Sequence, residues 1–181
     1  MRLVLVVLVL LGTLTLPASA AAVDPRLLVL QEADVPPGFE LDADDTGVQT
    51  NARAARGADA PTRALLRRSG RITGYQADYD FDDAMIRSRV DVFRQLDGAV
   101  LVLDAAARAF DTSGIRGMRR SPLRIGAEGW VFGQPSASST LTYVVWRYDR
   151  IYAGVAAWGV GKARAIALAR TQQRRIASAL R

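Results

Sequence analysis

The feature that most restricts the fold is the segment 141–159, LTYVVWRYDRIYAGVAAWG, which contains five aromatic residues. With Asp149 and Arg150 as a two-residue turn, this segment forms an antiparallel hairpin in which Arg147 faces Tyr152. Cross-strand partners share a face, so the apolar side chains divide between both faces. One face carries Tyr148, Trp146, Val144, Ile151, Ala153 and Val155, and the other carries Leu141, Tyr143, Val145, Arg147, Tyr152, Ala156 and Trp158. A sheet with one face in water alternates apolar with polar residues, so both faces of this hairpin must be covered.

One face is expected to be covered by helices, and three candidates can cover the other face. We expect helices over residues 97–111 and 164–180 to lie on one face, and the other face can be covered by residues 27–39, by a second copy of the chain, or by an apolar ligand. In the first case the aromatic residues are ordinary core, and truncating Trp158 to alanine would cost about 3–5 kcal/mol. In the last case they line an apolar pocket that has few polar groups. The candidate lining residues of that pocket are Tyr143, Tyr152, Trp158 and Trp130. Arg147 is either its anion-binding group or an arginine that extends to solvent at the sheet edge.

The rest of the chain predicts an α+β fold. Alternation with a period of two predicts strands over residues 73–81 and 86–94, joined by a turn at Asp82 and Asp83. Further strands are expected over 39–45 and 124–133, with loops over 112–123 and 134–139. Helices are expected over 27–33, twice within 50–69 with Asp59 capping the second, over 97–111 with Asp97 as N-cap, and over 162–181. We therefore expect a single domain over 21–181, built as one antiparallel sheet of about five to six strands with helices packed on it.

The N-terminus has the order of a secretory signal peptide. Arg2 precedes an apolar run over 3–16, and Pro17 and the triplet Ala18-Ser19-Ala20 follow. The run is shorter than the roughly 20 apolar residues that span a bilayer. We expect residues 1–20 to be cleaved as a signal peptide, an uncleaved anchor being the alternative. The domain is then exported to the periplasm, the cell wall or the exterior, and it meets the membrane through the signal segment before cleavage.

Composition removes most catalytic chemistry. The chain has no histidine, no cysteine and three glutamates, so it lacks the commonest general base and the usual zinc ligands. The acidic run 78–83 lacks the Gly and Glu of a calcium loop, which are Asp83 and Arg89 here, so we expect Asp78 and Asp80 on a solvated strand face. We therefore predict a non-enzyme without cofactor or metal.

The positive charge gathers at the C-terminus. Net charge is +6, and residues 162–181 hold six cations and no acid. Such a helix can dock on an anionic membrane surface or cell-wall polymer, but it lacks the Trp or Phe that such docking favours, so we interpret it as a solvated face. We expect no nucleic-acid partner for an exported chain.

Several segments together resemble a known group of domains. LLVLQEADVPPGF, RIGAEGWVF and YVVWRYDRIYAGVAAWG, followed by AIALARTQQRRIASAL, are similar to a pattern in small exported domains of high-GC bacteria, which include lipoproteins and extracellular sensor domains of membrane kinases. The resemblance implies the same α+β fold and a ligand cleft, and it brings no catalytic residue. We expect an envelope or extracellular domain that binds an apolar or amphipathic small molecule or an envelope protein. The alternative is a structural module that forms a homodimer through the 141–159 hairpin.

Overall fold

The computed structural model describes residues 23–112, 117–133 and 141–181. The expected signal peptide and its cleavage site, and the expected turn cluster over 134–139, lie outside these residues. Within the described ranges, no helix has both the length and the hydropathy that a bilayer crossing requires.

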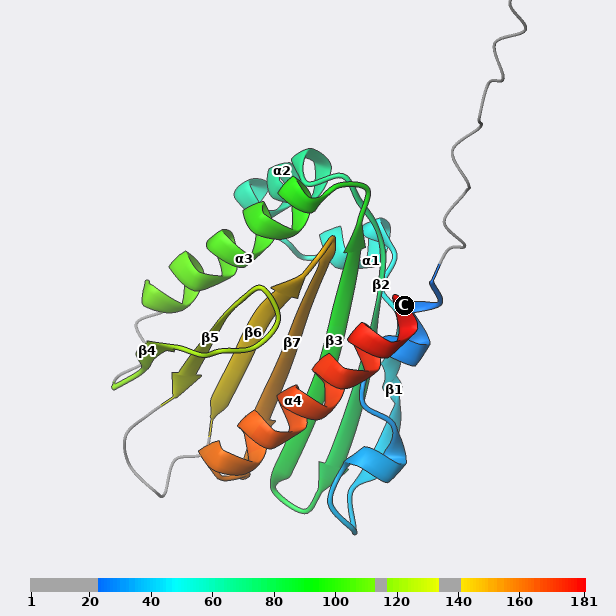
Figure 1. The fold of residues 1–181 in the computed structure, drawn as a ribbon, viewed down its shortest axis with the longest axis vertical. Helices are drawn as coiled ribbons and strands as arrows, with labels where there is room; N and C mark the ends of the chain where they lie inside the picture. The colour runs from blue at the N-terminus through cyan, green and yellow to red at the C-terminus, as the bar shows by residue number, and fades with distance from the viewer. Residues whose placement is uncertain (1–22, 113–116, 134–140) are drawn as a thin grey trace, which may run out of the picture.

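The described residues form one seven-stranded antiparallel sheet, which confirms the α+β class (Figure 1). Its strand order is β1-β2-β3-β7-β6-β5-β4. The strands are β1 (Glu40–Val48), β2 (Arg71–Phe81), β3 (Ala84–Phe93), β4 (Arg119–Pro122), β5 (Glu128–Gly133), β6 (Thr142–Tyr148) and β7 (Ile151–Trp158). The sheet therefore has one strand more than the expected upper count. The additional strand is β4, whose sequence RRSP has no apolar alternation and which was expected as loop.

The β6–β7 hairpin has the predicted register. Tyr148 pairs with Ile151, Arg147 pairs with Tyr152, and Asp149 and Arg150 form the turn. The φ angle of Asp149 is 51°, in the left-handed region that aspartate tolerates better than most residues. The hairpin of β2 and β3 is also as predicted, since Phe81 pairs with Ala84 around Asp82 and Asp83.

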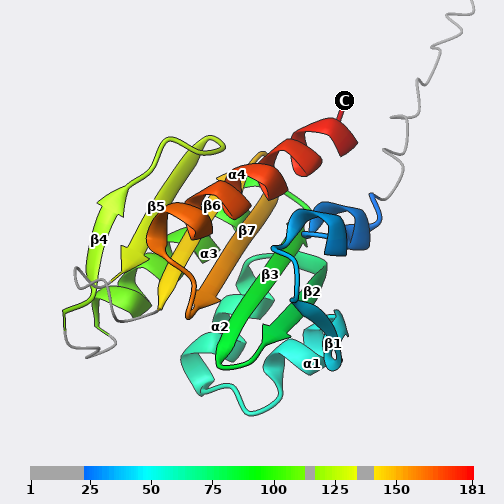
Figure 2. The same cartoon turned by 90° about the horizontal axis from the view of Figure 1, so that it is seen from below.

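Two different layers cover the two faces of the sheet (Figure 2). Helix α4 (Lys162–Ala179) and the N-terminal 3-10 helices η1 (Pro25–Leu28) and η2 (Glu32–Asp34) lie on one face, called here the α4 face. Helices α1 (Asn51–Ala55), α2 (Ala60–Arg68) and α3 (Leu96–Asp111) lie on the other, the α3 face. The prediction that the two long helices share one face is therefore wrong. Each helix has a single apolar stripe, and two apolar faces need one stripe each.

The N-terminal segment is fastened to the α4 face by buried polar groups. The Leu30 amide donates to Ser88 Oγ at 2.9 Å, and the Tyr79 hydroxyl donates to the Leu30 carbonyl at 2.8 Å. These bonds use the Leu30 backbone groups that a helix would pair internally. For that reason the predicted helix over 27–33 is wrong, and two short 3-10 turns flank an extended stretch.

The helices of the α3 face agree with the sequence except at one cap. Asp59 Oδ1 accepts from the Thr62 amide at 2.8 Å at the start of α2, as predicted. Asp97 was expected to cap α3, but the N-cap is Gln95, and Asp97 lies inside the first turn. An acidic residue there still favours the positive end of the helix dipole.

Candidate ligand-binding cleft

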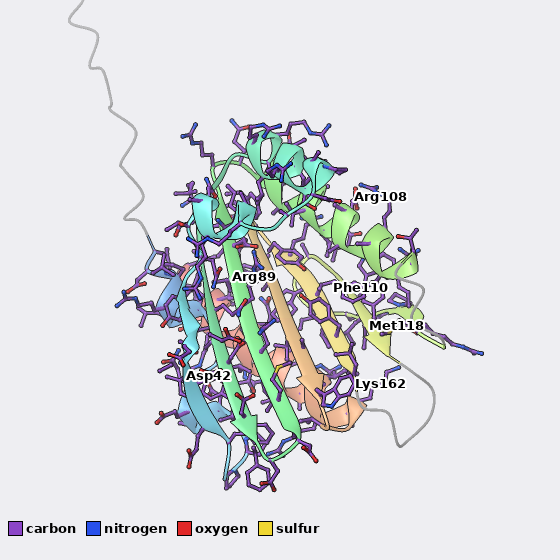
Figure 3. The ribbon with its side chains drawn as sticks, turned by 180° about the vertical axis from the view of Figure 1, so that it is seen from behind. Asp42, Arg89, Arg108, Phe110, Met118 and Lys162 are labelled. Carbon is purple, nitrogen blue, oxygen red and sulfur yellow. The ribbon has the colours of Figure 1, made fainter. Side chains whose placement is uncertain are left out.

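A cleft of about 260 Å³ lies on the α3 face, between α2, α3 and the sheet. Its helical walls are mainly apolar and its floor is polar. The walls are formed by Thr62, Leu65, Leu66, Val102, Ala105, Ala106 and Ala109, and the floor by Arg71, Arg89, Asp91, Tyr143 and Tyr152. Figure 3 looks onto this face and shows Arg89 on the sheet, with Phe110 near the end of α3. An apolar enclosure with a few placed polar groups is the usual composition of a small-molecule site.

The deepest part of the floor is a buried ion pair. Arg71 Nη2 lies 2.5 Å from Asp91 Oδ1, and the two side chains are 1% and 4% exposed. The other donors of Arg71 are also occupied, because Nη2 donates to the Gln49 carbonyl at 2.6 Å and Nη1 to Asn51 Oδ1 at 2.8 Å. Breaking such a pair is costly because it leaves an uncompensated buried charge. Arg71 and Asp91 are therefore held in place.

Gly74 makes room for this ion pair. A Cβ atom on Gly74 would overlap Asp91 Oδ1, Arg71 Nη2 and the Val90 carbonyl. Glycine within a strand commonly marks such a close approach of other groups to the backbone. The sheet is therefore shaped locally around the two charged side chains.

Arg89 shares the same aspartate but remains accessible. Its Nη2 lies 3.1 Å from Asp91 Oδ2, its Nε donates to the same oxygen at 3.2 Å, and its side chain is 31% exposed. Both oxygens of Asp91 consequently accept from guanidinium groups. Arg89 brings an accessible positive charge to the cleft.

Two tyrosines complete the floor beside Arg89. Tyr152 is buried, and burial, together with the neighbouring Tyr143, raises its pKa well above the ordinary value, so its hydroxyl is neutral at physiological pH. Tyr143 is half-buried, and its ring centroid lies 4.6 Å from that of Phe110. The two tyrosines therefore contribute polar hydroxyl groups and ring surface to the floor.

A second ion cluster lies on the same face outside the cleft. Arg87 Nη2 lies 2.5 Å from Asp78 Oδ2 and 3.6 Å from Asp45 Oδ2. Asp78 was predicted to face solvent, but it is 2% exposed, whereas Asp80 is exposed as predicted. Burial raises the pKa of Asp78 even though Arg87 opposes the shift. The prediction for Asp78 is wrong because Arg87 pairs with its carboxylate and the bulged part of β1, with Asp45 and Thr46, lies beside it.

The five predicted site residues do not form one site. Tyr143 and Tyr152 line the cleft together. Trp158 pairs with Met85 at the far end of β7 and is 47% exposed. Arg147 pairs with Glu128 at 3.4 Å, and Trp130 lies under the Arg120 guanidinium at 4.7 Å, both toward the β4 edge of the sheet. The structure thus brings together two of the five.

Trp130 borders a larger, open groove of about 780 Å³ between the β4–β5 loop and α4. Arg124, Arg170 and Arg174 line this groove, and none of them has an ion pair with another described residue. The groove is therefore an open basic surface, whereas the cleft lies between two helices and the sheet.

Sequence reasoning missed Arg71, Arg89 and Asp91. The alternation in β3 did place Arg89 and Asp91 on one face, opposite Val90. What it could not supply was the pairing of β3 with β7, which sets Asp91 directly opposite Tyr152. That pairing joins strands separated by more than fifty residues, so no local pattern reveals it.

No protein-family model matches this chain, and no curated protein sequence matches it. Among solved structures, it is similar to the extracellular domain of PknH from Mycobacterium tuberculosis, with a TM-score of 0.49 and 12% sequence identity over 84% of this chain and 94% of that one. This is a weak resemblance to an extracellular domain of a mycobacterial protein. Kinship with lipoproteins or kinase sensor domains stays a prediction.

Proposed function

We propose that this chain is an exported binding domain whose ligand site is the cleft between α2, α3 and the sheet. The observation that carries the proposal is the composition of the cleft, in which apolar helix residues face a polar floor of Tyr143, Tyr152 and Arg89. A site with one apolar wall and one polar floor suits a small amphipathic molecule. Export is proposed from the signal-peptide pattern of residues 1–20.

The cleft supports binding rather than catalysis. Asp91 is the one acid among its lining residues, and both of its oxygens accept hydrogen bonds from arginines. A general base must lie within hydrogen-bond reach of the proton that it abstracts, and both oxygens of Asp91 are occupied by arginine side chains. The remaining polar groups of the lining are two tyrosines, a threonine and two arginines, so no nucleophile stands next to a free base.

The alternative, self-association through the hairpin, has less surface available than the sequence suggested. Of the apolar side chains of β6 and β7, only Trp158 is exposed within these two described strands. Dimerisation through residues 141–159 stays a prediction, and it is read out in the same measurement as binding.

Native mass spectrometry of the protein purified from its own host tests the proposal. We expect the chain to carry a bound small molecule, and we expect the variant Ala109→Trp to lose it, because Ala109 lines the cleft and is exposed enough to accept a larger side chain. Ala167→Trp is the matched control, since Ala167 is exposed on α4, away from the cleft. Equal bound mass in both variants would place the ligand elsewhere, a bare monomer would contradict the proposal, and a bare dimer would favour the alternative.

A further inference from the structure

We infer that the cleft selects a small organic monoanion, a carboxylate on an apolar body, and that Arg89 binds its charged group. This inference rests on the proposed function and adds the class of ligand and the residue that recognises it. It comes from the charge balance of the cleft, the accessibility of its two arginines and the size of the space.

The floor of the cleft has one positive charge in excess. Arg71 and Arg89 share the single carboxylate of Asp91, and no other acidic residue lines the cleft. A guanidinium in such a partly enclosed, apolar-walled space loses hydration without gaining a full counter-charge. An anionic ligand group would supply that missing charge.

Arg89 is the arginine that can reach the ligand. Arg71 is 1% exposed and its donors are taken by Asp91, Gln49 and Asn51, so it holds Asp91 in position. Arg89 uses Nε and Nη2 on Asp91, and the described residues offer no hydrogen-bond partner to its Nη1. Since no buried side-chain nitrogen or oxygen of the described residues lacks a partner, this nitrogen is not fully buried. A planar guanidinium with free donors is well suited to a carboxylate.

The neighbouring ion cluster shows that this charge excess is local. Arg87 lies on the same strand and face as Arg89 and has a similar side-chain exposure, 38% against 31%. It is paired with two carboxylates, Asp78 and Asp45, so that cluster has an excess of negative charge. Arg87 does not line the cleft. The two arginines therefore form a natural pair of test and control positions.

The volume limits the apolar part of the ligand. About 260 Å³ is just below the roughly 300–1,000 Å³ that ligand sites usually span. The walls beside the floor are side chains such as Leu65, Val102 and Ala106. A short aliphatic chain or a single ring fits this space, and a long acyl chain does not.

Three probes with the same six-carbon chain, hexanoate, hexanamide and hexylamine, test the charge preference of residues 21–181 by isothermal titration calorimetry. We expect hexanoate to bind roughly 10- to 100-fold more tightly than hexanamide, the range that one or two charge-assisted hydrogen bonds provide, and hexylamine to bind weakest. Arg89→Gln should remove this preference for hexanoate and leave hexanamide unchanged. Arg87→Gln should leave both affinities unchanged, and circular dichroism should confirm that each variant is folded.

Equal affinity for hexanoate and hexanamide in the unmodified chain would overturn the inference without any variant, even if Arg89→Gln failed to fold. Equal losses in Arg87→Gln and Arg89→Gln would also overturn it, because they would indicate general electrostatics. In both cases the proposed cleft still stands. Absence of hexanoate binding also overturns the inference. The proposed function is tested separately, and it is overturned if the native protein carries no ligand that Ala109→Trp removes.

Discussion

The two tryptophans of the hairpin have opposite environments although both lie in apolar strands. Trp146 is fully buried on the α4 face, and its Nε1 donates to Gln173 Oε1 at 2.6 Å. Trp158 is 47% exposed. We predict that Trp146→Ala lowers the free energy of unfolding by about 3–5 kcal/mol, and Trp158→Ala by about 1 kcal/mol, measured by urea denaturation. A similar loss in both variants would show that the exposed ring packs in solution against something outside this chain.

Tyr79 should titrate abnormally late. Burial, with smaller contributions from Glu32 and Asp34, raises its pKa from 10.0 to about 12. The folded state then keeps a proton that the unfolded state loses, so the contribution of Tyr79 to stability is complete below pH 10 and is lost as the pH rises toward 12. Ultraviolet absorbance during alkaline titration should show late tyrosinate formation from the two buried tyrosines, Tyr79 and Tyr152, and Tyr79→Phe should reduce its amplitude by one tyrosinate.

The same variant measures the hydrogen bond from Tyr79 to Leu30. Removing the hydroxyl leaves the Leu30 carbonyl without its side-chain donor, which costs about 1–3 kcal/mol when the site is buried. Tyr75→Phe on the same strand face is the control, because Tyr75 is half-buried and its hydroxyl makes no described hydrogen bond. Equal losses of stability in the two variants would contradict the assigned role of the bond.

At the scale of elements, the turn residue Asp149 tests the hairpin. Its φ of 51° is one that a β-branched residue adopts only with strain. We predict that Asp149→Val lowers stability by about 1–2 kcal/mol, whereas Asp149→Gly is neutral or slightly stabilising. The neighbouring Arg150 has negative φ, so Arg150→Val should have a much smaller effect. Thermal unfolding followed by circular dichroism separates these cases, and equal losses at both positions would mean that the turn differs from the one described.

Elements with a regular local pattern were predictable, and those without one were not. The register of β6 with β7 followed from Asp149 and Arg150, because a two-residue turn fixes every pair beyond it. Strand β4 was missed because RRSP resembles a loop and becomes a strand only through its pairing with β5. The assignment of α3 and α4 to opposite faces depends on contacts across the whole chain, which no single segment encodes.

At the scale of the whole molecule, the candidate site also combines residues that a local pattern predicts with residues that no local pattern predicts. Tyr143 and Tyr152 were predictable because one hairpin places them on a common face. Arg89 and Asp91 were missed because they reach that face through the pairing of β3 with β7, which is non-local. The alternation in β3 would have suggested them only if that strand order had been known.

The final prediction concerns the two layers that cover the sheet. Leu103 on α3 and Ile176 on α4 are both fully buried, on opposite faces. Each change to alanine should cost about 2–5 kcal/mol, because each leaves a cavity in its own core. Since the sheet separates the two sites, the losses should add in the double variant within about 0.5 kcal/mol.

If the molecule is one cooperative unit, both single variants should also unfold in one step, with tryptophan fluorescence and far-ultraviolet circular dichroism giving the same midpoint. The fluorescence reports on Trp130 in the α3-side core, Trp146 in the α4-side core and the exposed Trp158, whereas the circular dichroism reports on all helices and strands. Separate midpoints in Leu103→Ala alone would show that the α3 layer opens independently of the α4 layer. The cleft would then be a site whose wall can move, and its affinity for a small anion would fall with the population of the open state.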